Sequence, residues 1–214
     1  PMSRVDAREA LGLPLDRRIM LSVGGLNEGK GHHHLIEILP ALLKRHPDLL
    51  YVIVGGGQPG NSYRPVLERM VREGGLESHV LLAGERLHEE IPRWMGAADL
   101  FCLATRSEGW ANVLLEALAC GRPVVSTRVG GNAEIVVGEH LGLLAPYGDR
   151  SALERALMDA LSRHWEPETL AAHARRHSWD VTADHVLEEL MRLAPNTTVT
   201  DRRKIVGDPT GSRG

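Results

Sequence analysis

Two carboxylates that could bind hydroxyl groups, Glu108 and Glu116, lie eight positions apart in the middle of the chain. An apolar, strand-like run at 98–104 precedes the first, and a helical pattern underlies the second. The spacing predicts that Glu108 follows the carboxyl end of a strand and that Glu116 lies about two turns along the next helix. The free amides that open this helix after Gly109 would attract an anion. The pattern indicates a site for an anion with hydroxyl-rich groups on both sides, as in a nucleotide-sugar.

A lysine could supply the positive charge of such a site. Lys30 stands between Gly29 and Gly31 at an expected helix start, where an anion is already favoured. Taken alone, a lysine is most often a solvated surface residue, and Glu108 and Glu116 taken alone could be a helix cap and a surface charge. The sequence that flanks Glu108 and Glu116 favours the functional interpretation of the two carboxylates. The setting between Gly29 and Gly31 favours it for Lys30.

The elements that must position these residues alternate along the chain. Short apolar runs that end in turn signals predict strands, and 3.6-residue apolar periodicity predicts the helices between them. This order predicts an α/β fold, a Rossmann-like parallel sheet of about six strands with helices on both faces. The expected strands are 19–23, 50–54, 80–83, 99–104, 123–127 and 142–145. The expected helices are about 35–47, 63–73, 89–95, one carrying Glu116, 133–137, 150–163, 168–177 and 181–193.

Composition bounds the class of protein. The chain has 214 residues, 43% of them apolar, and a formal net charge of −3, which gives no general attraction to nucleic acid or to an acidic membrane. Its two cysteines do not make a disulfide framework, and both Cys102 and Cys120 are expected to be small buried residues of a cytoplasmic protein. We expect one domain over 1–194 and a flexible tail over 195–214, where periodicity ends. Pro1 before Met2 is typical of a domain taken from a longer protein.

At this point the motifs resemble a known family. The chain over about 10–193 resembles the C-terminal, donor-binding half of GT-B glycosyltransferases, specifically the retaining family four. The specific part runs from Ser107-Glu-Gly-Trp-Ala-Asn to Gly130-Gly-Asn-Ala-Glu134, and three shorter segments, 22–31, 53–57 and 98–101, match in order and spacing. The resemblance implies one half of a GT-B fold.

The resemblance also implies roles for individual residues. Glu116 would accept hydrogen bonds from the ribose, Glu108 would lie under the transferred sugar, and Lys30 would neutralise the diphosphate. Backbone amides of 109–112 would face the diphosphate and sugar, and the turn 84–86 would hold the base. Lys30 and Glu108 would then be the catalytic residues. The implied donor-binding set is Gly24, Gly25, Lys30, Gly55, Gly84, Arg86, Glu108, Gly109, Trp110, Ala111, Asn112 and Glu116.

The chain departs from the family pattern at one position. An arginine normally stands five residues before the lysine, and Gly25 occupies that position here. Loss of a bidentate guanidinium should cost stabilisation of the leaving diphosphate. Arg86, Arg106 and Arg128 are the candidate substitutes.

Other interpretations of the motifs are weaker. The segment 55–60 fits the G-x-G-x-x-G pattern of a dinucleotide site, but Pro59 and Pro65 delay the helix that should meet the pyrophosphate. The run 32–34 contains three histidines, which point to different sides of a helix, so we expect a surface run and no metal site. The chain has no Asp-x-Asp pair, which favours donor binding without a metal or other cofactor.

A few further residues carry weaker expectations. The sequon at 196–198 is expected to be a chance match in the tail. Trp94 and Trp179 are expected in the core, whereas Trp110 could either stack near a sugar or pack.

The sequence therefore predicts the donor-binding domain of a retaining glycosyltransferase that uses a nucleotide-diphosphate sugar. The partners that the resemblance implies are this donor and a missing N-terminal domain, which would carry the acceptor pocket and any peripheral membrane contact. Without that domain, the isolated chain is expected to be inactive or nearly so. The alternative is a non-catalytic nucleotide- or carbohydrate-binding module derived from such an enzyme, which Gly25 favours and the Glu108–Glu116 pair opposes.

Overall fold

The structure is a computed structural model that describes residues 2–57, 62–177, 183, 186–190 and 192. The chain divides into two units, Pro1–Arg176 and His177–Gly214. Within the second unit, residues 183, 186–190 and 192 are helical, in agreement with part of the helix expected at 181–193. Trp179, the expected domain end at 194 and the tail at 195–214 lie outside the described residues.

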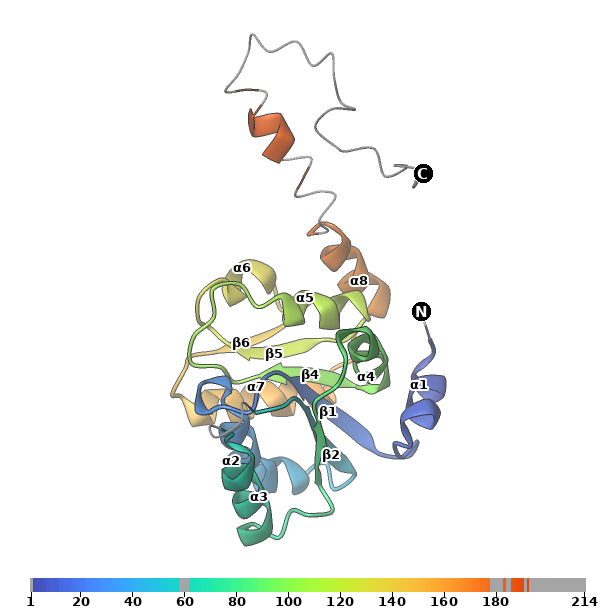
Figure 1. The fold of residues 1–214 in the computed structure, drawn as a ribbon, viewed down its shortest axis with the longest axis vertical. Helices are drawn as coiled ribbons and strands as arrows, with labels where there is room; N and C mark the ends of the chain where they lie inside the picture. Colours follow the sequence, from blue (N-terminus) through green and yellow to red (C-terminus); the bar gives the residue numbers. More distant parts are fainter. Residues whose placement is uncertain (1, 58–61, 178–182, 184–185, 191, 193–214) are drawn as a thin grey trace, which may run out of the picture. The chain divides into compact units, whose positions relative to one another are not determined.

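The first unit is built on a six-stranded parallel sheet in the order β3-β2-β1-β4-β5-β6 (Figure 1). Each strand matches an expected one to within about two residues at its ends, which is the usual scatter of such boundaries. The fold prediction is therefore confirmed. The strands are β1 (Arg18–Val23), β2 (Leu49–Val54), β3 (Val80–Gly84), β4 (Leu100–Leu103), β5 (Val124–Thr127) and β6 (Gly142–Ala145).

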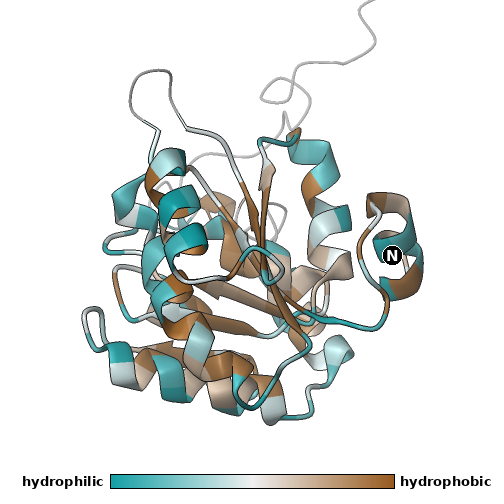
Figure 2. Cartoon of the chain, turned by 90° about the horizontal axis from the view of Figure 1, so that it is seen from below, coloured by the Kyte–Doolittle hydropathy of each residue, from teal (hydrophilic) through white to brown (hydrophobic). Residues whose placement is uncertain are grey.

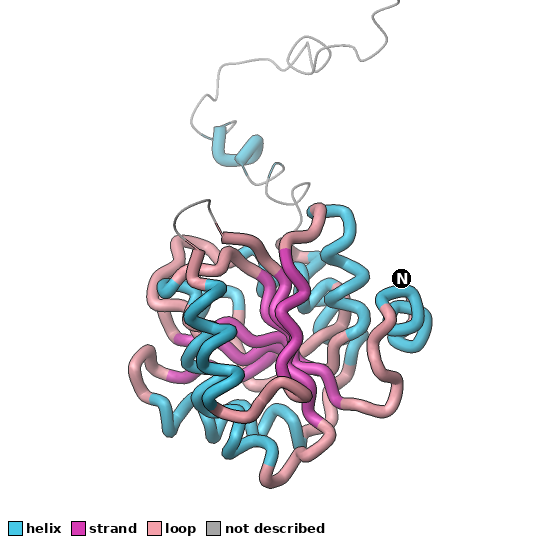
Figure 3. The backbone as a smooth tube through the Cα atoms, turned by 60° about the horizontal axis from the view of Figure 1, so that its bottom comes forward, coloured by secondary structure: helices cyan, strands magenta, loops and turns pink. Residues whose placement is uncertain are grey.

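Helices cover both faces of this sheet (Figure 3). The helices α1, α4, α5, α6 and α8 contribute to one hydrophobic cluster, and α2, α3 and α7 pack on the opposite face. Burial on both faces explains why β2 is apolar and buried along its whole length, and Figure 2 shows the strands as a hydrophobic centre. The helices are α1 (Arg4–Leu11), α2 (His32–Leu43), α3 (Arg64–Glu73), α4 (Ile91–Ala97), α5 (Asn112–Ala119), α6 (Asn132–Ile135), α7 (Arg150–Ser162) and α8 (Pro167–Arg175).

Helix α1 was not predicted from the sequence. The Ser3 side chain accepts a hydrogen bond from the Asp6 amide at its start, and Gly12 ends it with a left-handed φ of 64°. Its Arg8 is buried and forms an ion pair of 2.7 Å with Asp99, which fixes the helix beside the start of β4. The cap and the glycine were the available signals, but the helix is short and mostly polar, so its apolar periodicity is weak.

The order of the strands places a topological switch point between β1 and β4. From β1 the chain proceeds through β2 and β3 to one edge, and from β4 it proceeds through β5 and β6 to the other. The loops that leave the carboxyl ends of β1 and β4 therefore diverge, and such a crevice is where open α/β sheets bind ligands. Lys30 follows β1 and Glu108 follows β4, so both predicted catalytic residues lie at this crevice.

No helix among the described residues is long and apolar enough to cross a membrane.

Candidate functional site

Lys30 and Glu108 meet across the switch point. The Lys30 Nζ lies 2.6 Å from the Glu108 Oε1, with 31% of the lysine side chain and 14% of the glutamate side chain exposed. Lys30 ends a 3-10 turn, η1 (Glu28–Lys30), whose start is capped because the Asn27 Oδ1 accepts a hydrogen bond of 3.1 Å from the Lys30 amide. The capped turn fixes the backbone of Lys30 beside the Glu108 loop. From there the Lys30 ammonium reaches the Glu108 carboxylate.

The loops that carry the two residues are bonded to each other. The Gly29 carbonyl accepts hydrogen bonds from the Arg106 amide at 2.8 Å and from the Thr105 Oγ1 at 3.1 Å. The next glycine allows this approach, because a Cβ on Gly31 would lie 1.9 Å from the Ala104 carbonyl oxygen. The geometry between Lys30 and the Glu108 loop is thus fixed by backbone contacts.

A glycine pair after β5 supports the Glu108 loop from the other side, and its role was not predicted. A Cβ on Gly130 would lie 1.7 Å from the Glu108 carbonyl oxygen, and the Gly131 amide donates to the Gly109 carbonyl at 2.9 Å. Asn132 then anchors the turn, because its Nδ2 donates to the Thr127 carbonyl at 3.0 Å. The signal was present in the sequence as Gly-Gly-Asn within the specific motif, but the partner of these glycines lies about twenty residues earlier.

Helix α5 begins beside Glu108 without a side-chain cap. Asn112 is its first residue and is exposed, and Glu116 lies in its second turn, half-buried. Burial raises the pKa of the Cys120 thiol; the Arg122 guanidinium offsets this in part, and the Glu116 carboxylate, about one helical turn before Cys120, adds to it. An uncapped helix start leaves amide groups and the positive end of the helix dipole available to an anion.

Trp110 and Ala111 complete the turn between Glu108 and α5. Trp110 is 41% exposed, and a Cβ on Gly131 would lie 2.7 Å from its ring, so the indole packs on the glycine turn while one side faces solvent. Ala111 is buried. The structure therefore supports packing for Trp110 and leaves contact with a sugar as a prediction.

The predicted glycines Gly24, Gly55 and Gly84 lie together at the carboxyl ends of β1, β2 and β3. The Gly55 amide donates to the Gly84 carbonyl at 2.9 Å, and a Cβ on Gly55 would lie 1.9 Å from the Gly24 carbonyl oxygen. The close approach of neighbouring loops requires Gly55 whether or not a ligand is present. Gly25 is different, because it is exposed, has no left-handed φ, and a Cβ there would first meet the Asn27 Nδ2 at 3.3 Å.

Arg86 lies at the same edge but interacts locally. Its guanidinium stands 5.6 Å from the ring centre of Trp94, a cation–π contact. Trp94 is 4% exposed, which confirms its predicted place in the core.

The histidine run is not a surface run at its first position. His32 is 1% exposed, and burial lowers its pKa to about 4, which the carbonyl groups of Gly24 and Gly25 offset only in part. Its Nδ1 lies 3.4 Å from the hydroxyl of Tyr51, and its Nε2 has no well-formed hydrogen bond. The first turn of α2 points His32 under the Gly24–Gly25 loop, whereas the two later histidines stay partly exposed, so the expected surface run is wrong at its first position.

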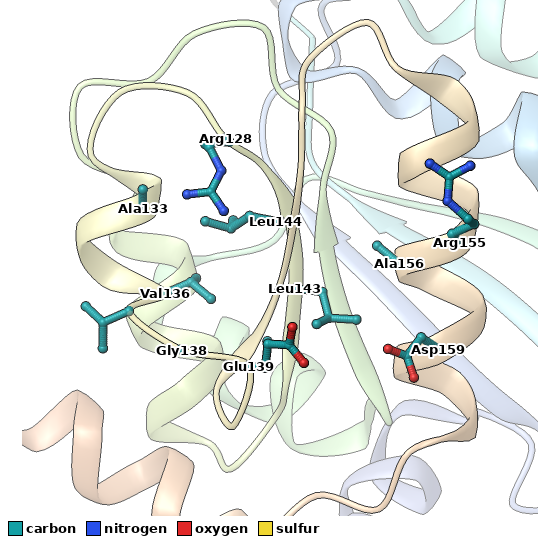
Figure 4. Close-up of a pocket in the computed structure, with 12 residues that line it drawn as sticks. Arg128, Ala133, Val136, Gly138, Glu139, Leu143, Leu144, Arg155, Ala156 and Asp159 are labelled. Atoms are coloured by element: carbon teal, nitrogen blue, oxygen red, sulfur yellow. The ribbon is translucent and has the colours of Figure 1, made fainter.

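A cavity of about 480 Å³ lies away from these residues, beside the edge strand β6 (Figure 4). It lies between α6 and α7, and its charged lining comes from Arg128, Glu139, Arg155 and Asp159. None of its lining residues belongs to the predicted donor-binding set. The predicted site is thus part of the open carboxyl edge of the sheet and is separate from this cavity.

Within the described part of the chain, no three His, Cys, Asp or Glu side chains converge as metal ligands would.

Comparison with known proteins gives a family. The family model described as glycosyl transferases group 1 matches residues 3–177. A D-inositol 3-phosphate glycosyltransferase of Corynebacterium urealyticum is 35% identical over 214 residues, covering 97% of this chain and 50% of the relative. A GDP-mannose-dependent alpha-(1-6)-phosphatidylinositol monomannoside mannosyltransferase of Mycolicibacterium smegmatis is 36% identical over 80% of this chain and 45% of its own length.

Solved structures agree with this result. Sucrose-phosphate synthase of Thermosynechococcus elongatus superimposes with a TM-score of 0.73 at 31% identity, over 90% of this chain and 49% of that one. Anabaena HepE in complex with UDP gives a TM-score of 0.75 at 25% identity, over 88% of this chain and 52% of that one. The chain thus spans about half the length of the proteins that it matches.

Proposed function

The chain belongs to the group 1 glycosyltransferase family, and we propose that it is the donor-binding domain of a retaining glycosyltransferase that uses a nucleotide-diphosphate sugar. The observation that carries the proposal is the Lys30–Glu108 contact of 2.6 Å at the switch point, beside the uncapped start of α5. A cation, free helix amides and a carboxylate there offer groups for a phosphate and for sugar hydroxyls.

Each residue then has a distinct task. Glu116 accepts hydrogen bonds from the ribose hydroxyls, and the amides from Gly109 to Asn112 face the diphosphate and the sugar. Lys30 stabilises the negative charge that grows on the diphosphate as the glycosidic bond breaks. Glu108 lies under the transferred sugar, where it binds hydroxyls and favours positive charge at the anomeric carbon.

Two neighbours support a nucleotide as the ligand. HepE was solved with UDP, and one relative is named GDP-mannose-dependent. Calorimetric titrations with UDP, GDP and ADP should identify the nucleobase that the site prefers. We expect Lys30→Ala to weaken binding of the preferred nucleotide by about tenfold or more, and Lys44→Ala, an exposed control at the end of α2, to leave it unchanged. Equal affinities of the two variants would refute the site.

The ribose contact has its own test. Glu116→Ala should weaken nucleotide binding by about 1–3 kcal/mol, which is usual for a hydrogen bond to a charged group. The fold should stay intact, because its half-buried carboxylate has no hydrogen bond or ion pair among the described residues. If this variant binds nucleotide as tightly as the parent, Glu116 does not contact the ribose.

We propose that donor binding needs no divalent metal, because Lys30 and the α5 amides can meet a diphosphate directly. Titrations with EDTA and with magnesium or manganese at matched ionic strength should agree. An affinity about tenfold higher with metal, about 1.4 kcal/mol, would contradict this.

The whole enzyme's activity needs the other half of the molecule in this proposal, since the relatives are about twice as long. The isolated chain should bind donor and transfer little or no sugar. A non-catalytic binding module is the second candidate, favoured by Gly25 in place of a cation. A protein that joins this chain to an N-terminal half decides between the two candidates. Sugar transfer by that protein would support the enzyme, and nucleotide binding without sugar transfer would support the module.

A further inference from the structure

The candidate site is short of positive charge for the ligand proposed above. Lys30 is bonded to Glu108 at 2.6 Å, so the pair is neutral as a unit. Glu116 adds a negative charge, and Gly25 adds none. A diphosphate carries more than one negative charge, so a second protein cation beside Lys30 and the helix amides would strengthen its binding here.

Three arginines lie in loops that leave strands at the carboxyl edge: Arg86 after β3, Arg106 after β4 and Arg128 after β5. The guanidinium of Arg86 is placed over the ring of Trp94 at 5.6 Å. Arg128 lines the cavity beside β6, and Figure 4 shows its guanidinium between α6 and β6. Both are therefore directed at local surroundings other than the Lys30–Glu108 contact.

Arg106 is tied to the site by its backbone. Its amide donates to the Gly29 carbonyl at 2.8 Å, one residue before Lys30, and it stands two residues before Glu108. Its side chain is exposed and makes no hydrogen bond, ion pair or ring contact within the described part of the chain. Arg106 thus carries a guanidinium that has no partner among the described residues, at the point where the loop after β1 is hydrogen-bonded to the loop after β4.

We propose that Arg106 is the second diphosphate-binding cation of this chain and replaces the charge that Gly25 lacks. The inference rests on the proposed function. A guanidinium suits the task because it stays charged and can bind two phosphate oxygens at once, whereas the Lys30 ammonium acts as a point charge. The attachment to Gly29 holds its Cα in place, so less conformational freedom is lost on binding.

The test compares Arg106→Gln with Arg128→Gln, an exposed arginine at the same edge of the sheet, and with Arg45→Gln, an exposed arginine just after α2. Calorimetry on the chain measures affinity for UDP, GDP and ADP, and for the monophosphate of whichever base binds best. Arg106→Gln should lower diphosphate affinity about tenfold or more and monophosphate affinity much less. The two control substitutions should each change diphosphate affinity by less than about threefold.

A rescue experiment sharpens the result. The Gly25 backbone has no left-handed φ, and a Cβ there would lie 3.3 Å from the Asn27 Nδ2, so a side chain fits once this side-chain amide shifts by a few tenths of an ångström. Gly25→Arg should restore most of the diphosphate affinity in the Arg106→Gln protein and add less in the parent. Arg106→Lys should keep part of the affinity, which separates lost charge from lost folding.

The outcomes separate the two proposals. If Arg106→Gln binds like the controls while the parent binds a nucleoside diphosphate, the Arg106 inference is wrong and the proposed function stands. A tenfold loss in Arg128→Gln instead would also overturn it. If the parent binds no nucleoside diphosphate, both fail.

Discussion

At the scale of single residues, the structure joins two predicted catalytic groups in an ion pair. The Glu108 carboxylate is 14% exposed and lies 2.6 Å from the Lys30 ammonium. The two opposite charges therefore compensate each other where the surrounding protein partly excludes water. In the proposed site, a diphosphate would share or take over the lysine. We therefore expect this contact to affect donor binding before any sugar is transferred.

Glu108→Gln should make UDP or GDP bind more tightly, by about 1 kcal/mol at low salt, because it removes a negative charge and frees Lys30. Glu28→Gln is the control, since it makes the same charge change on an exposed residue of the same turn. Calorimetry of the two variants against the parent gives the result. Weaker nucleotide binding in Glu108→Gln would mean that the carboxylate holds Lys30 in its binding position.

His32 should make the fold sensitive to acid. Its folded-state pKa of about 4 lies below the ordinary value of 6.5, so the unfolded chain binds a proton that the native chain excludes. Stability is therefore present above pH 6.5 and falls as the pH drops toward 4, by about 2 kcal/mol between pH 7 and pH 5. His32→Phe should lose less stability over this interval than the parent in denaturant unfolding, while exposed His88→Phe should not differ from it. If stability falls equally with pH in His32→Phe and in the parent, His32 is not the group responsible. The charges of His33 and Lys30 also lower the His32 pKa, and both residues are present in the two proteins.

At the scale of elements, backbone contacts between loops position the site. Gly31, Gly130 and Gly131 let carbonyl groups of neighbouring loops approach where a Cβ would collide, and the Gly29 carbonyl bonds the loop after β1 to the loop after β4. These contacts join residues far apart in the chain. They explain how the Lys30–Glu108 geometry is held.

Gly130→Ala tests this support. The new Cβ would lie 1.7 Å from the Glu108 carbonyl oxygen at a φ of 48°, so we expect the Glu108 loop to move and nucleotide affinity to fall at least about tenfold. Gly12→Ala is the matched control, with a φ of 64° and nothing within 4 Å, and should cost only about 1–2 kcal/mol of backbone strain. Calorimetry and thermal unfolding measure the two effects. If Gly130→Ala binds nucleotide like the parent, the glycine turn does not hold the site.

The sequence predicted the elements whose periodicity is strong and local. All six strands and the helices from α2 to α8 follow from apolar runs bounded by turn signals. Helix α1 was missed because its stability comes from its capping residues and from the Arg8–Asp99 pair, which spans 91 positions. His32 was misassigned because the side that a residue faces in the first turn of a helix depends on tertiary packing.

Parts of the site were less accessible to sequence reasoning. The loops of Lys30 and Glu108 were predicted to share one edge, but their direct bond spans 78 positions and needs the strand order. The support from Gly130 depends on a collision that only coordinates reveal. Gly55 was predicted to bind donor, and the structure gives it a packing reason as well.

At the scale of the whole molecule, the first of the two units, Pro1–Arg176, is doubly wound, and its switch point carries the candidate site. The chain corresponds to about half of each compared protein, so the acceptor and the complete reaction belong to a longer assembly in our proposal. The central claim for this chain is narrower. We propose that a nucleoside diphosphate binds at the carboxyl ends of β1 and β4.

Amide chemical-shift mapping during titration with the preferred nucleoside diphosphate tests that claim most directly. We predict that the largest changes fall at 24–31 and 107–116, the loops that meet at the Lys30–Glu108 contact. Changes confined to the residues around Arg128, Glu139 and Asp159 beside β6, or to the Gly55 loop alone, would contradict it.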